Sequence, residues 1–274
     1  MPINHLKKII KTFKGNSDWE RIAPSEKMQK YIEGFYIFSC ADIEYKQLIF
    51  NDGFPAIIFL PSMTDHVSFQ IASSLVRLQT GWVNGGVMKN IYINNLNAVD
   101  TILVLRFKSY AFYDIFNLSP SFFRNKSVVS LGDINFDQSI LDKIYSEKEI
   151  IDRIRQIELY IENFMFTPKN NVLFDSAISS IHNAKGQITV SNVVNKIGVN
   201  YKWLERNFLN YLGITPKEYI QLQRFIFAYI NFTDSKTKDL TEIALISGFY
   251  DYNHFLKEFK SYTGKTPLEY INLN

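Results

Sequence analysis

The first half of the chain alternates short apolar runs with turn residues. Between Tyr31 and Phe107 the runs are rich in isoleucine, valine, phenylalanine and tyrosine, and they read YIEGFYIF, KQLIF, AIIFL, VSFQI, VMKNIYI and ILVLRF. The turn signals between them include Asn51-Asp52-Gly53, Pro61-Ser62 and Gly85-Gly86. Short β-branched and aromatic runs separated by such turns favour strands. We therefore predict an antiparallel β barrel or sandwich, within an α+β protein, for this half.

After Ser109 the apolar residues recur at helical spacing. The change begins in SYAFYDIFNL and continues from about Ser139 to Phe166, where isoleucines recur at roughly three- and four-residue steps at Ile140, Ile144, Ile151, Ile154, Ile157 and Ile161. Such spacing predicts an amphipathic helix or pair of helices that lies on a partner. The segment TPKNN, from Thr167 to Asn171, favours a break before the last helical region. We therefore predict a β-rich regulatory domain over 1–135, a helical connector or dimerisation segment over 136–168, and an all-helical domain over 172–274.

An internal repeat dominates the last third of the chain. YLGITPKEYI, Tyr211 to Ile220, matches YTGKTPLEYI, Tyr262 to Ile271, at an offset of 51 residues. The same offset pairs Leu204 with Phe255 and Phe208 with Phe259, which fixes the buried face of one helix in each copy. Upstream, each copy has a shorter apolar helix that ends at a glycine, Gly198 or Gly248, where the chain needs a left-handed backbone. The sequence of each copy therefore predicts a helix, a tight turn and a second helix.

These residues resemble the DNA-binding domain of the AraC/XylS family of bacterial transcription regulators. The resemblance rests on NVVNKIGVNYKWLERNFLNYLGITPKEYIQLQRF and LTEIALISGFYDYNHFLKEFKSYTGKTPLEYI, and it covers about Ile188 to Tyr270. It implies two helix-turn-helix units that bind double-stranded DNA, and it implies RNA polymerase as a partner. Because activation is the commoner behaviour of the family, we expect an activator. Neither the operator nor the regulated genes follow from the sequence.

The outward face of the second helix in each unit is the expected reading surface. In the first unit the buried positions leave Lys202, Glu205, Arg206 and Leu209 outside. In the second unit the surface comprises Tyr252, Asn253, His254, Leu256, Lys257 and Lys260. Arginine suits guanine, and lysine suits guanine or phosphate. The alternative for each residue is a solvated helix face. We expect Leu209 to pack against its neighbours and Lys260 to contact a phosphate.

One connecting helix is expected between the two units. Pro216 suits a helix start, and the run KEYIQLQRFIFAYINF places Tyr219, Leu222, Ile226 and Ile230 on one buried stripe. A rigid connector would hold the reading helices about one DNA turn apart, roughly 34 Å. The sequence therefore predicts an asymmetric site that one monomer reads in two adjacent major grooves.

The N-terminal half bears a looser resemblance to the sensor domain found in a subset of the same family. The similar segments are NDGFPAIIFLP and LVLRFKSYAFYDIFNLSPSFF, within residues 20–165. The resemblance implies a small-molecule effector or a partner, and it does not identify either. Aromatic candidates for a pocket are Tyr36, Phe54, Trp82 and Tyr92, with Arg106 as an anion anchor. Core packing is the alternative for each aromatic residue, and a dimerisation or protein-interaction module without ligand is the alternative for the whole half.

Composition and charge narrow the possible functions. The formal net charge is only +3, so the DNA hypothesis depends on local side chains and not on bulk charge. Cys40 is the single cysteine, which excludes an internal disulfide and a cysteine-based zinc site; we expect it to be buried. The four histidines, His5, His66, His182 and His254, are far apart in the sequence. We therefore expect no metal site and no cofactor.

Two further classes are disfavoured by missing motifs. A barrel enzyme fused to a DNA-binding domain is the competing hypothesis, but the chain has no GxSxG elbow and no glycine-rich phosphate loop, so we expect no enzyme. No apolar run approaches the ~18 residues of a membrane span, and lysines occupy the N-terminal segment where a signal peptide would be apolar. We expect a cytoplasmic protein without a membrane partner.

Overall fold

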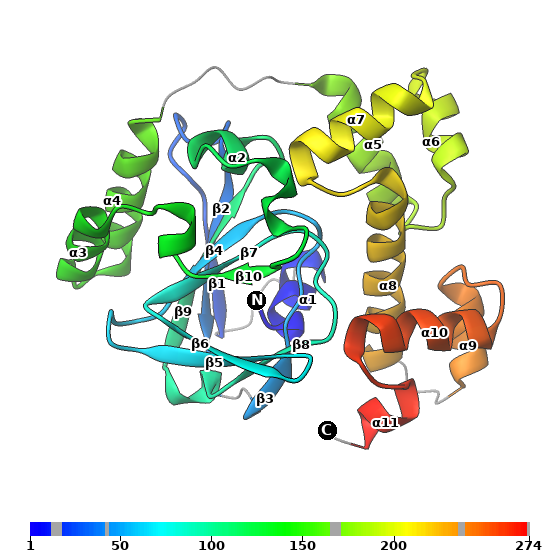
Figure 1. The fold of residues 1–274 in the computed structure, drawn as a ribbon, viewed down its shortest axis with the longest axis horizontal. Coiled ribbons are helices and arrows are strands. Elements are labelled where there is room, and N and C mark those ends of the chain that lie inside the picture. Colours follow the sequence, from blue (N-terminus) through cyan, green and yellow to red (C-terminus); the bar gives the residue numbers. More distant parts are fainter. Residues whose placement is uncertain (12–17, 42–43, 165–170, 235–238, 273–274) are drawn as a thin grey trace.

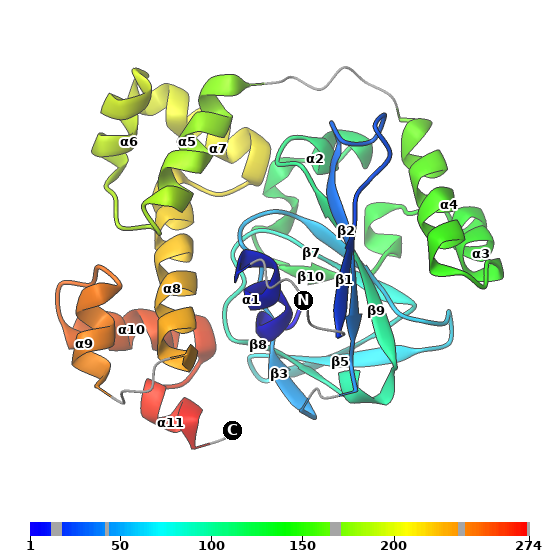
Figure 2. The ribbon, with the colours of Figure 1, turned by 180° about the vertical axis from the view of Figure 1, so that it is seen from behind.

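The computed structural model describes residues 1–11, 18–41, 44–164, 171–234 and 239–272. Figures 1 and 2 show a β-rich region and a helical region that lie side by side, with helices α3 and α4 on the side of the β-rich region away from the C-terminal helices. We call residues 18–134 the barrel and residues 171–272 the C-terminal helical region. This arrangement confirms the α+β fold with an antiparallel N-terminal region and an all-helical C-terminal region.

Two antiparallel sheets form the barrel. One has the strand order β1-β2-β9-β4-β7-β10 and the other has the order β3-β8-β5-β6. The strands are β1 (Trp19–Ile22), β2 (Ile32–Ser39), β3 (Lys46–Leu48), β4 (Ala56–Phe59), β5 (His66–Ile71), β6 (Ser74–Gln79), β7 (Gly81–Asn84), β8 (Ile91–Asn94), β9 (Thr101–Phe107) and β10 (Val128–Val129). β4 lies between β7 and β9 and is buried throughout, whereas β6 is an edge strand with exposed residues. Cross-strand register places Phe35 opposite Leu105, so both pack into the same core.

The predicted strands are present, but one of them starts later than predicted, and two further strands among them were not predicted. The run VMKNIYI forms a strand only from Ile91 onward, because Asn90 has a left-handed backbone with φ of 52° and contacts the helical region. Strands β6 and β7 were not predicted. β6 forms a hairpin with β5 that turns at Ala72, with φ of 51°, and at Thr80, with φ of 70°, the chain passes from β6 in one sheet to β7 in the other. Neither residue is a glycine, so no ordinary turn signal marks these positions.

Short helices and 3₁₀ turns cover the barrel. They are α1 (Ile3–Lys11), η1 (Leu96–Ala98), α2 (Ala111–Ile115), η2 (Pro120–Phe123), η3 (Gly132–Ile134), α3 (Gln138–Ser146) and α4 (Ile150–Glu162). The isoleucine-rich stretch is thus a pair of helices. Ile154, Ile157 and Ile161 are buried, but Ile151 is 52% exposed and does not belong to the predicted buried stripe. Thr167 and Pro168 of the expected break lie outside the described residues, and Asn171 caps the next helix.

Seven helices are described in the C-terminal helical region. They are α5 (Val172–Asn183), α6 (Val190–Ile197), α7 (Tyr201–Leu212), α8 (Pro216–Asp234), α9 (Leu240–Ile246), α10 (Tyr252–Thr263) and α11 (Pro267–Ile271). α8 runs between the two helix pairs α6/α7 and α9/α10 in Figure 1. With 19 residues it is about 28 Å long. Its predicted stripe Tyr219, Leu222, Ile226 and Ile230 is buried.

The barrel and the helical region share a hydrophobic core. One cluster of buried residues joins Phe50 and Tyr92 of the barrel to Phe225 of α8 and Tyr262 of α10. Aromatic rings make the junction, with Phe50 lying 5.1 Å from Phe225 and 5.5 Å from Tyr262 between ring centroids. The junction is therefore a packed interface that places the C-terminal helices at a defined position on the barrel.

Candidate nucleic-acid interface and its contacts with the barrel

The first helix-turn-helix unit is α6, a glycine turn and α7. Thr189 caps α6 and Asn200 caps α7, each through its side-chain oxygen, and Gly198 between them has φ of 75°. Leu204 and Phe208 are fully buried, as their spacing predicts. The turn and the two caps are local sequence signals, so this unit forms where the sequence places it.

Lys202 and Arg206 are exposed on the outer face of α7. Glu205 lies beside them, half-buried, and accepts a hydrogen bond from the Tyr201 hydroxyl at 2.9 Å. Leu209 is also half-buried. The structure thus brings the predicted residues of the first reading surface together on one face and leaves the two cations free to meet a phosphate or a base edge.

The second unit repeats this arrangement with α9 and α10. Asp239 caps α9, Asp251 caps α10, and Gly248 in the turn has φ of 78°. Phe255 and Phe259 are fully buried. The predicted surface residues on α10 comprise the exposed Asn253, His254, Lys257 and Lys260 and the half-buried Tyr252. The second unit therefore has the same helix arrangement as the first, and the corresponding face of its second helix is exposed.

The repeated Thr-Pro-x-Glu segment is a pair of helix caps. In the second copy the Glu269 backbone N–H donates to Thr266 Oγ1 at 3.3 Å, and the Thr266 backbone N–H donates to Glu269 Oε2 at 2.7 Å. In the first copy Thr215 and Glu218 exchange the equivalent bonds at 3.2 and 2.7 Å. Each capping box starts a helix directly after α7 or α10, with proline at its first position.

A partly buried carboxylate in α10 was not predicted from the sequence. Glu258 has a side chain that is only 10% exposed, and one of its oxygens, Oε1, has no hydrogen-bond partner. Burial raises the pKa of Glu258 to about 7, against the opposing charges of Arg224 and Lys89. His254 Nε2 lies 3.7 Å from the other oxygen. Helical spacing alone does not reveal this burial, because Arg224 and Lys89 beside Glu258 are remote from it in sequence.

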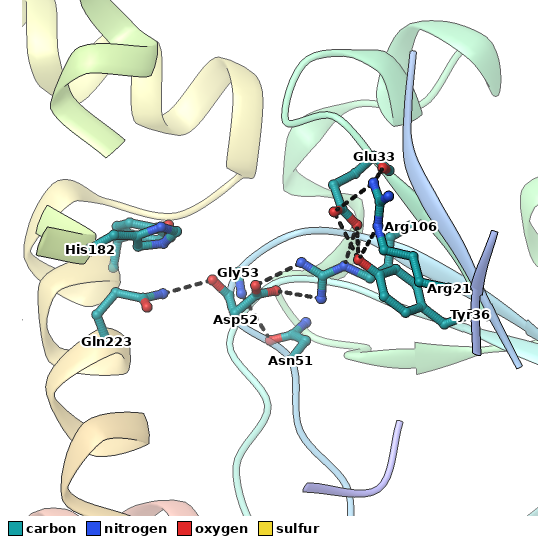
Figure 3. A network of polar contacts seen from close by, with 10 residues as sticks. Arg21, Glu33, Tyr36, Asn51, Asp52, Gly53, Arg106, His182 and Gln223 are labelled. Atoms are coloured by element: carbon teal, nitrogen blue, oxygen red, sulfur yellow. Dashed lines mark hydrogen bonds and ion pairs between the residues drawn. The ribbon is translucent and has the colours of Figure 1, made fainter. Parts of the chain in front are cut away.

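A network of polar contacts joins the barrel to α8, and Figure 3 shows it. Arg106 of β9 donates to both oxygens of Asp52, at 3.3 and 2.8 Å, and to Glu33 at 3.1 Å. The Gln223 side chain of α8 donates to the backbone carbonyl of Asp52 at 2.8 Å. Burial alone would raise the pKa of Asp52, but the charge and hydrogen bonds of Arg106 hold this pKa below its usual value.

The predicted pocket residues occupy three different places. Arg106 and Phe54 line a cavity of about 360 Å³ between the barrel and α5, to which Asp52, Lys108, Asp175 and His182 also contribute. Tyr36 lies next to this network and donates from its hydroxyl to Glu33 at 2.9 Å. Trp82 is fully buried inside the barrel, at 5.3 Å from Phe69 between ring centroids. The structure therefore brings Phe54 and Arg106 together and places Trp82 apart from them.

Tyr92, the remaining candidate, lines a second cavity of about 350 Å³ between the barrel and the C-terminal helices. Lys46 of β3, Tyr229 of α8, and Lys265 and Tyr270 near the C-terminus share its lining. Tyr92 also lies next to the end of α10, where its hydroxyl donates to the Thr263 carbonyl at 2.6 Å. Both cavities thus occupy the junction of the barrel and the helical region.

In the portion of the chain that the structure describes, no group of three histidine, cysteine, aspartate or glutamate side chains is placed to hold a metal ion. No described helix combines the length and the apolar character needed to cross a membrane. Cys40 is buried.

Two family models match separate parts of the chain. Residues 193–272 match the family described as a helix-turn-helix domain, and residues 20–129 match a family described as a domain of unknown function. No curated protein matches the chain.

Three solved structures illustrate the similarity. ToxT from Vibrio cholerae is 14% identical, with 94% of this chain and 99% of that chain covered and a TM-score of 0.44. An AraC-type regulator from Chromobacterium violaceum is 26% identical over 35% of this chain and 87% of that chain, with a TM-score of 0.33. The C-terminal domain of the response regulator yesN from Fusobacterium nucleatum is 28% identical over 35% of this chain and 94% of that chain, with a TM-score of 0.33.

Proposed function

We propose that this chain, a DNA-binding transcription regulator with an AraC-type helix-turn-helix domain at its C-terminus, reads an asymmetric DNA site with α7 and α10 in two successive major grooves. The observation that carries the proposal is the duplication of one helix, glycine turn and helix, with a cation exposed at the same position of each copy. Arg206 and Lys257 are 51 residues apart, as are Lys202 and Asn253. All four side chains are exposed.

Arg206 and Lys257 are the residues on which the proposed reading depends most. A bidentate arginine contact with guanine contributes about 1–3 kcal/mol of discrimination, and a lysine contributes charge to a base or a phosphate. Glu205, Asn253, Tyr252 and His254 complete the proposed base-reading surfaces, while Lys202 and Lys260 are placed to meet phosphates. The connecting helix α8 keeps the two surfaces on one rigid support.

The test begins with selection of bound sites from random DNA by the full chain. We expect two unlike subsites about one helical turn apart. The double variant R206A/K257A should then bind the selected site at least about ten-fold more weakly at fixed salt. R77A/K143A removes the same charge from exposed positions on β6 and α3 and is the matched control. Unchanged affinity of R206A/K257A would remove these residues from the reading surfaces.

For the N-terminal region, we propose control by a small molecule that enters the cavity between the barrel and α5. Phe54 supplies an apolar wall, Lys108 and Arg106 supply positive charge, and Asp175 and His182 belong to the helical region. A ligand there would touch both regions of the molecule, which is what coupling to DNA binding requires. Ser179 is exposed at the edge of the cavity, so S179W should block it without removing a buried contact. Calorimetry against a metabolite panel should find a ligand for the natural chain that S179W no longer binds.

A second candidate role for the N-terminal half is self-association through α4. Ile151 and Leu159 on this helix are 52% and 51% exposed, although they are large and apolar. Helix α4 lies on the side of the barrel away from α7 and α10, so a homodimer through α4 would leave both of these helices accessible (Figure 1). Sedimentation of the full chain and of I151E/L159E should separate a dimer from a monomer.

The proposed regulator has three parts, a regulatory domain over 1–135, a connector over 136–168 and a DNA-binding domain over 172–274. We also propose that it activates transcription and contacts RNA polymerase.

A further inference from the structure

The two reading helices end at equivalent residues, and the barrel contacts both ends in the same way. The Tyr113 hydroxyl of α2 donates to the Leu212 carbonyl oxygen at 3.3 Å, and the Tyr92 hydroxyl of β8 donates to the Thr263 carbonyl oxygen at 2.6 Å. Leu212 and Thr263 are 51 residues apart, and are therefore the same position of the repeat. As the last residues of α7 and α10, both have carbonyls that lack a partner within the helix. One barrel tyrosine supplies the missing donor in each unit.

The positions on either side of these carbonyls are also matched. One residue earlier, Tyr211 lies 6.4 Å from Tyr110 and Tyr262 lies 5.5 Å from Phe50, both measured between ring centroids. Together with the glycines that follow in the chain, three consecutive positions of the repeat contact the barrel in each copy.

One residue after the carbonyls, Gly213 and Gly264 have φ of 71° and 76°. An added Cβ would lie 1.9 Å from the Pro120 carbonyl oxygen at Gly213, and 2.2 Å from Asn90 Oδ1 at Gly264. Only glycine fits the contact with the Pro120 backbone, and at Gly264 the Asn90 side chain would have to move to admit a larger residue. The repeated glycine thus serves the approach of the barrel as well as the end of the helix.

The barrel holds the ends of the reading helices and leaves the reading faces exposed. The contacts described above fall on residues 211–213 and 262–264, whereas Lys202, Arg206, Asn253 and Lys257 are exposed. In Figure 1 both helices run from the barrel toward α6 and α9. Between the two ends, Gln223 of α8 is bonded to the Asp52 carbonyl at 2.8 Å. The barrel therefore contacts the C-terminal ends of α7 and α10 and also the helix α8 that connects them.

We propose that Tyr92 and Tyr113 are positioning residues that set the distance between the two DNA subsites by holding the same carbonyl in each helix-turn-helix unit. The proposal rests on the proposed function, since it concerns how the two reading surfaces are spaced. The barrel then acts as a second connector beside α8. A conformational change in the barrel would therefore alter the distance between DNA subsites at which the protein binds best.

The test measures DNA binding as a function of subsite spacing. Fluorescence anisotropy is recorded with the full chain on the site selected from random DNA, on the same site with one to three base pairs added or removed between the subsites, and on a site with one subsite scrambled. The variants are Y92F/Y113F, which keeps both rings and removes both hydroxyls, and Y145F as a control. Tyr145 donates to the Leu60 and Thr80 carbonyls of the barrel and does not contact the reading helices through its hydroxyl.

We expect Y92F/Y113F to reduce the preference for the selected spacing about three- to ten-fold, as the loss of two net hydrogen bonds allows. Its affinity for the single-subsite DNA should equal that of the natural chain, and Y145F should keep the natural preference. An unchanged spacing preference would overturn the proposal. Uniformly tighter binding at every spacing would also overturn it, because the tyrosines would then restrain the helices away from DNA. If the natural chain selects no DNA, the proposed function fails and the positioning role with it, an outcome distinct from the other two.

Discussion

The two helix-turn-helix units have the same fold but differ in how tightly the barrel holds them. The end of α7 accepts one hydrogen bond from the barrel at 3.3 Å. The end of α10 accepts two, from Tyr92 to the Thr263 carbonyl and from the Asn90 backbone N–H to the Tyr262 carbonyl, each at 2.6 Å. Lys89 adds a cation over the Tyr262 ring at 5.2 Å from its centroid. The second unit is thus the one more closely coupled to the barrel.

The units also differ at one buried polar position. Asn207 in α7 and Glu258 in α10 are equivalent in the repeat, 51 residues apart. The Asn207 amide donates to the Trp203 carbonyl at 2.7 Å and accepts from Asn171 at 2.8 Å, so both of its ends are satisfied. Glu258 instead has an oxygen without a partner. Repetition therefore preserves the fold, while single substitutions decide how each copy responds to its surroundings.

The largest expected effects come from the glycines that end α7 and α10. G213A combines a left-handed alanine with a clash against the backbone oxygen of Pro120, so it should lower the free energy of unfolding by about 3–4 kcal/mol. G264A meets the Asn90 side chain, which can rotate, and should cost about 2 kcal/mol. G198A is the matched control, since Gly198 has φ of 75° but nothing within 4 Å of an added Cβ. It should cost only about 1 kcal/mol.

Urea unfolding of the three glycine variants measures this order. The predicted order would show that the end of α7 rests on the fixed backbone of Pro120, whereas the end of α10 rests on the Asn90 side chain, which can rotate. Equal costs for G213A and G198A would mean that the end of α7 does not rest on Pro120 in solution.

The next effect is the pH dependence expected from Glu258. Its pKa is raised to about 7 in the folded chain, whereas an unfolded glutamate titrates near 4.5. The folded state therefore binds more protons between these two values, and the free energy of unfolding should fall as pH rises from about 4.5 to 7. E258Q, which keeps the shape and removes the charge, should flatten this slope and stabilise the chain at pH 8 by about 1–3 kcal/mol.

Thermal or urea unfolding at several pH values tests the role of Glu258. E149Q is the control, because Glu149 is exposed and makes no side-chain cap bond. Arg224 and Lys89 are the cations around Glu258, His254 is its titratable neighbour on α10, and all three remain in E258Q. A slope that persists in E258Q would assign the titration to another group.

The helix-turn-helix units could be predicted from the sequence because their determinants are local. Caps at Thr189 and Asn200, left-handed glycines and buried pairs such as Leu204 and Phe208 act within one or two helical turns. The contacts with the barrel could not be predicted in this way. The bonds from Tyr92 to Thr263 and from Gln223 to Asp52 each join residues 171 positions apart. No period or motif in the chain records such a contact, so only the packed structure reveals it.

A smaller effect distinguishes the two tyrosines in stability measurements. Y92F removes a short hydrogen bond to a buried carbonyl and should lower the free energy of unfolding by about 1–1.5 kcal/mol. Y113F removes a longer one and should cost about 0.5 kcal/mol. Hydrogen exchange can locate the change, with faster exchange at the end of α10 in Y92F and at the end of α7 in Y113F. Costs in the opposite order would contradict the tighter hold on the second unit.

The smallest effect concerns a charge that only the second unit carries. Lys260 is exposed at the end of α10, while the equivalent residue in α7 is the half-buried Leu209. A lysine that neutralises one phosphate contributes about 0.9 to the slope of the logarithm of the binding constant against the logarithm of salt concentration. K260A should reduce the slope by about that amount and weaken binding to all sequences alike, whereas L209A should leave it unchanged. Binding measured over a range of salt concentrations decides the point. An equal slope for K260A and the natural chain would place Lys260 away from the DNA backbone, and a loss confined to one DNA sequence would make it a reader of bases.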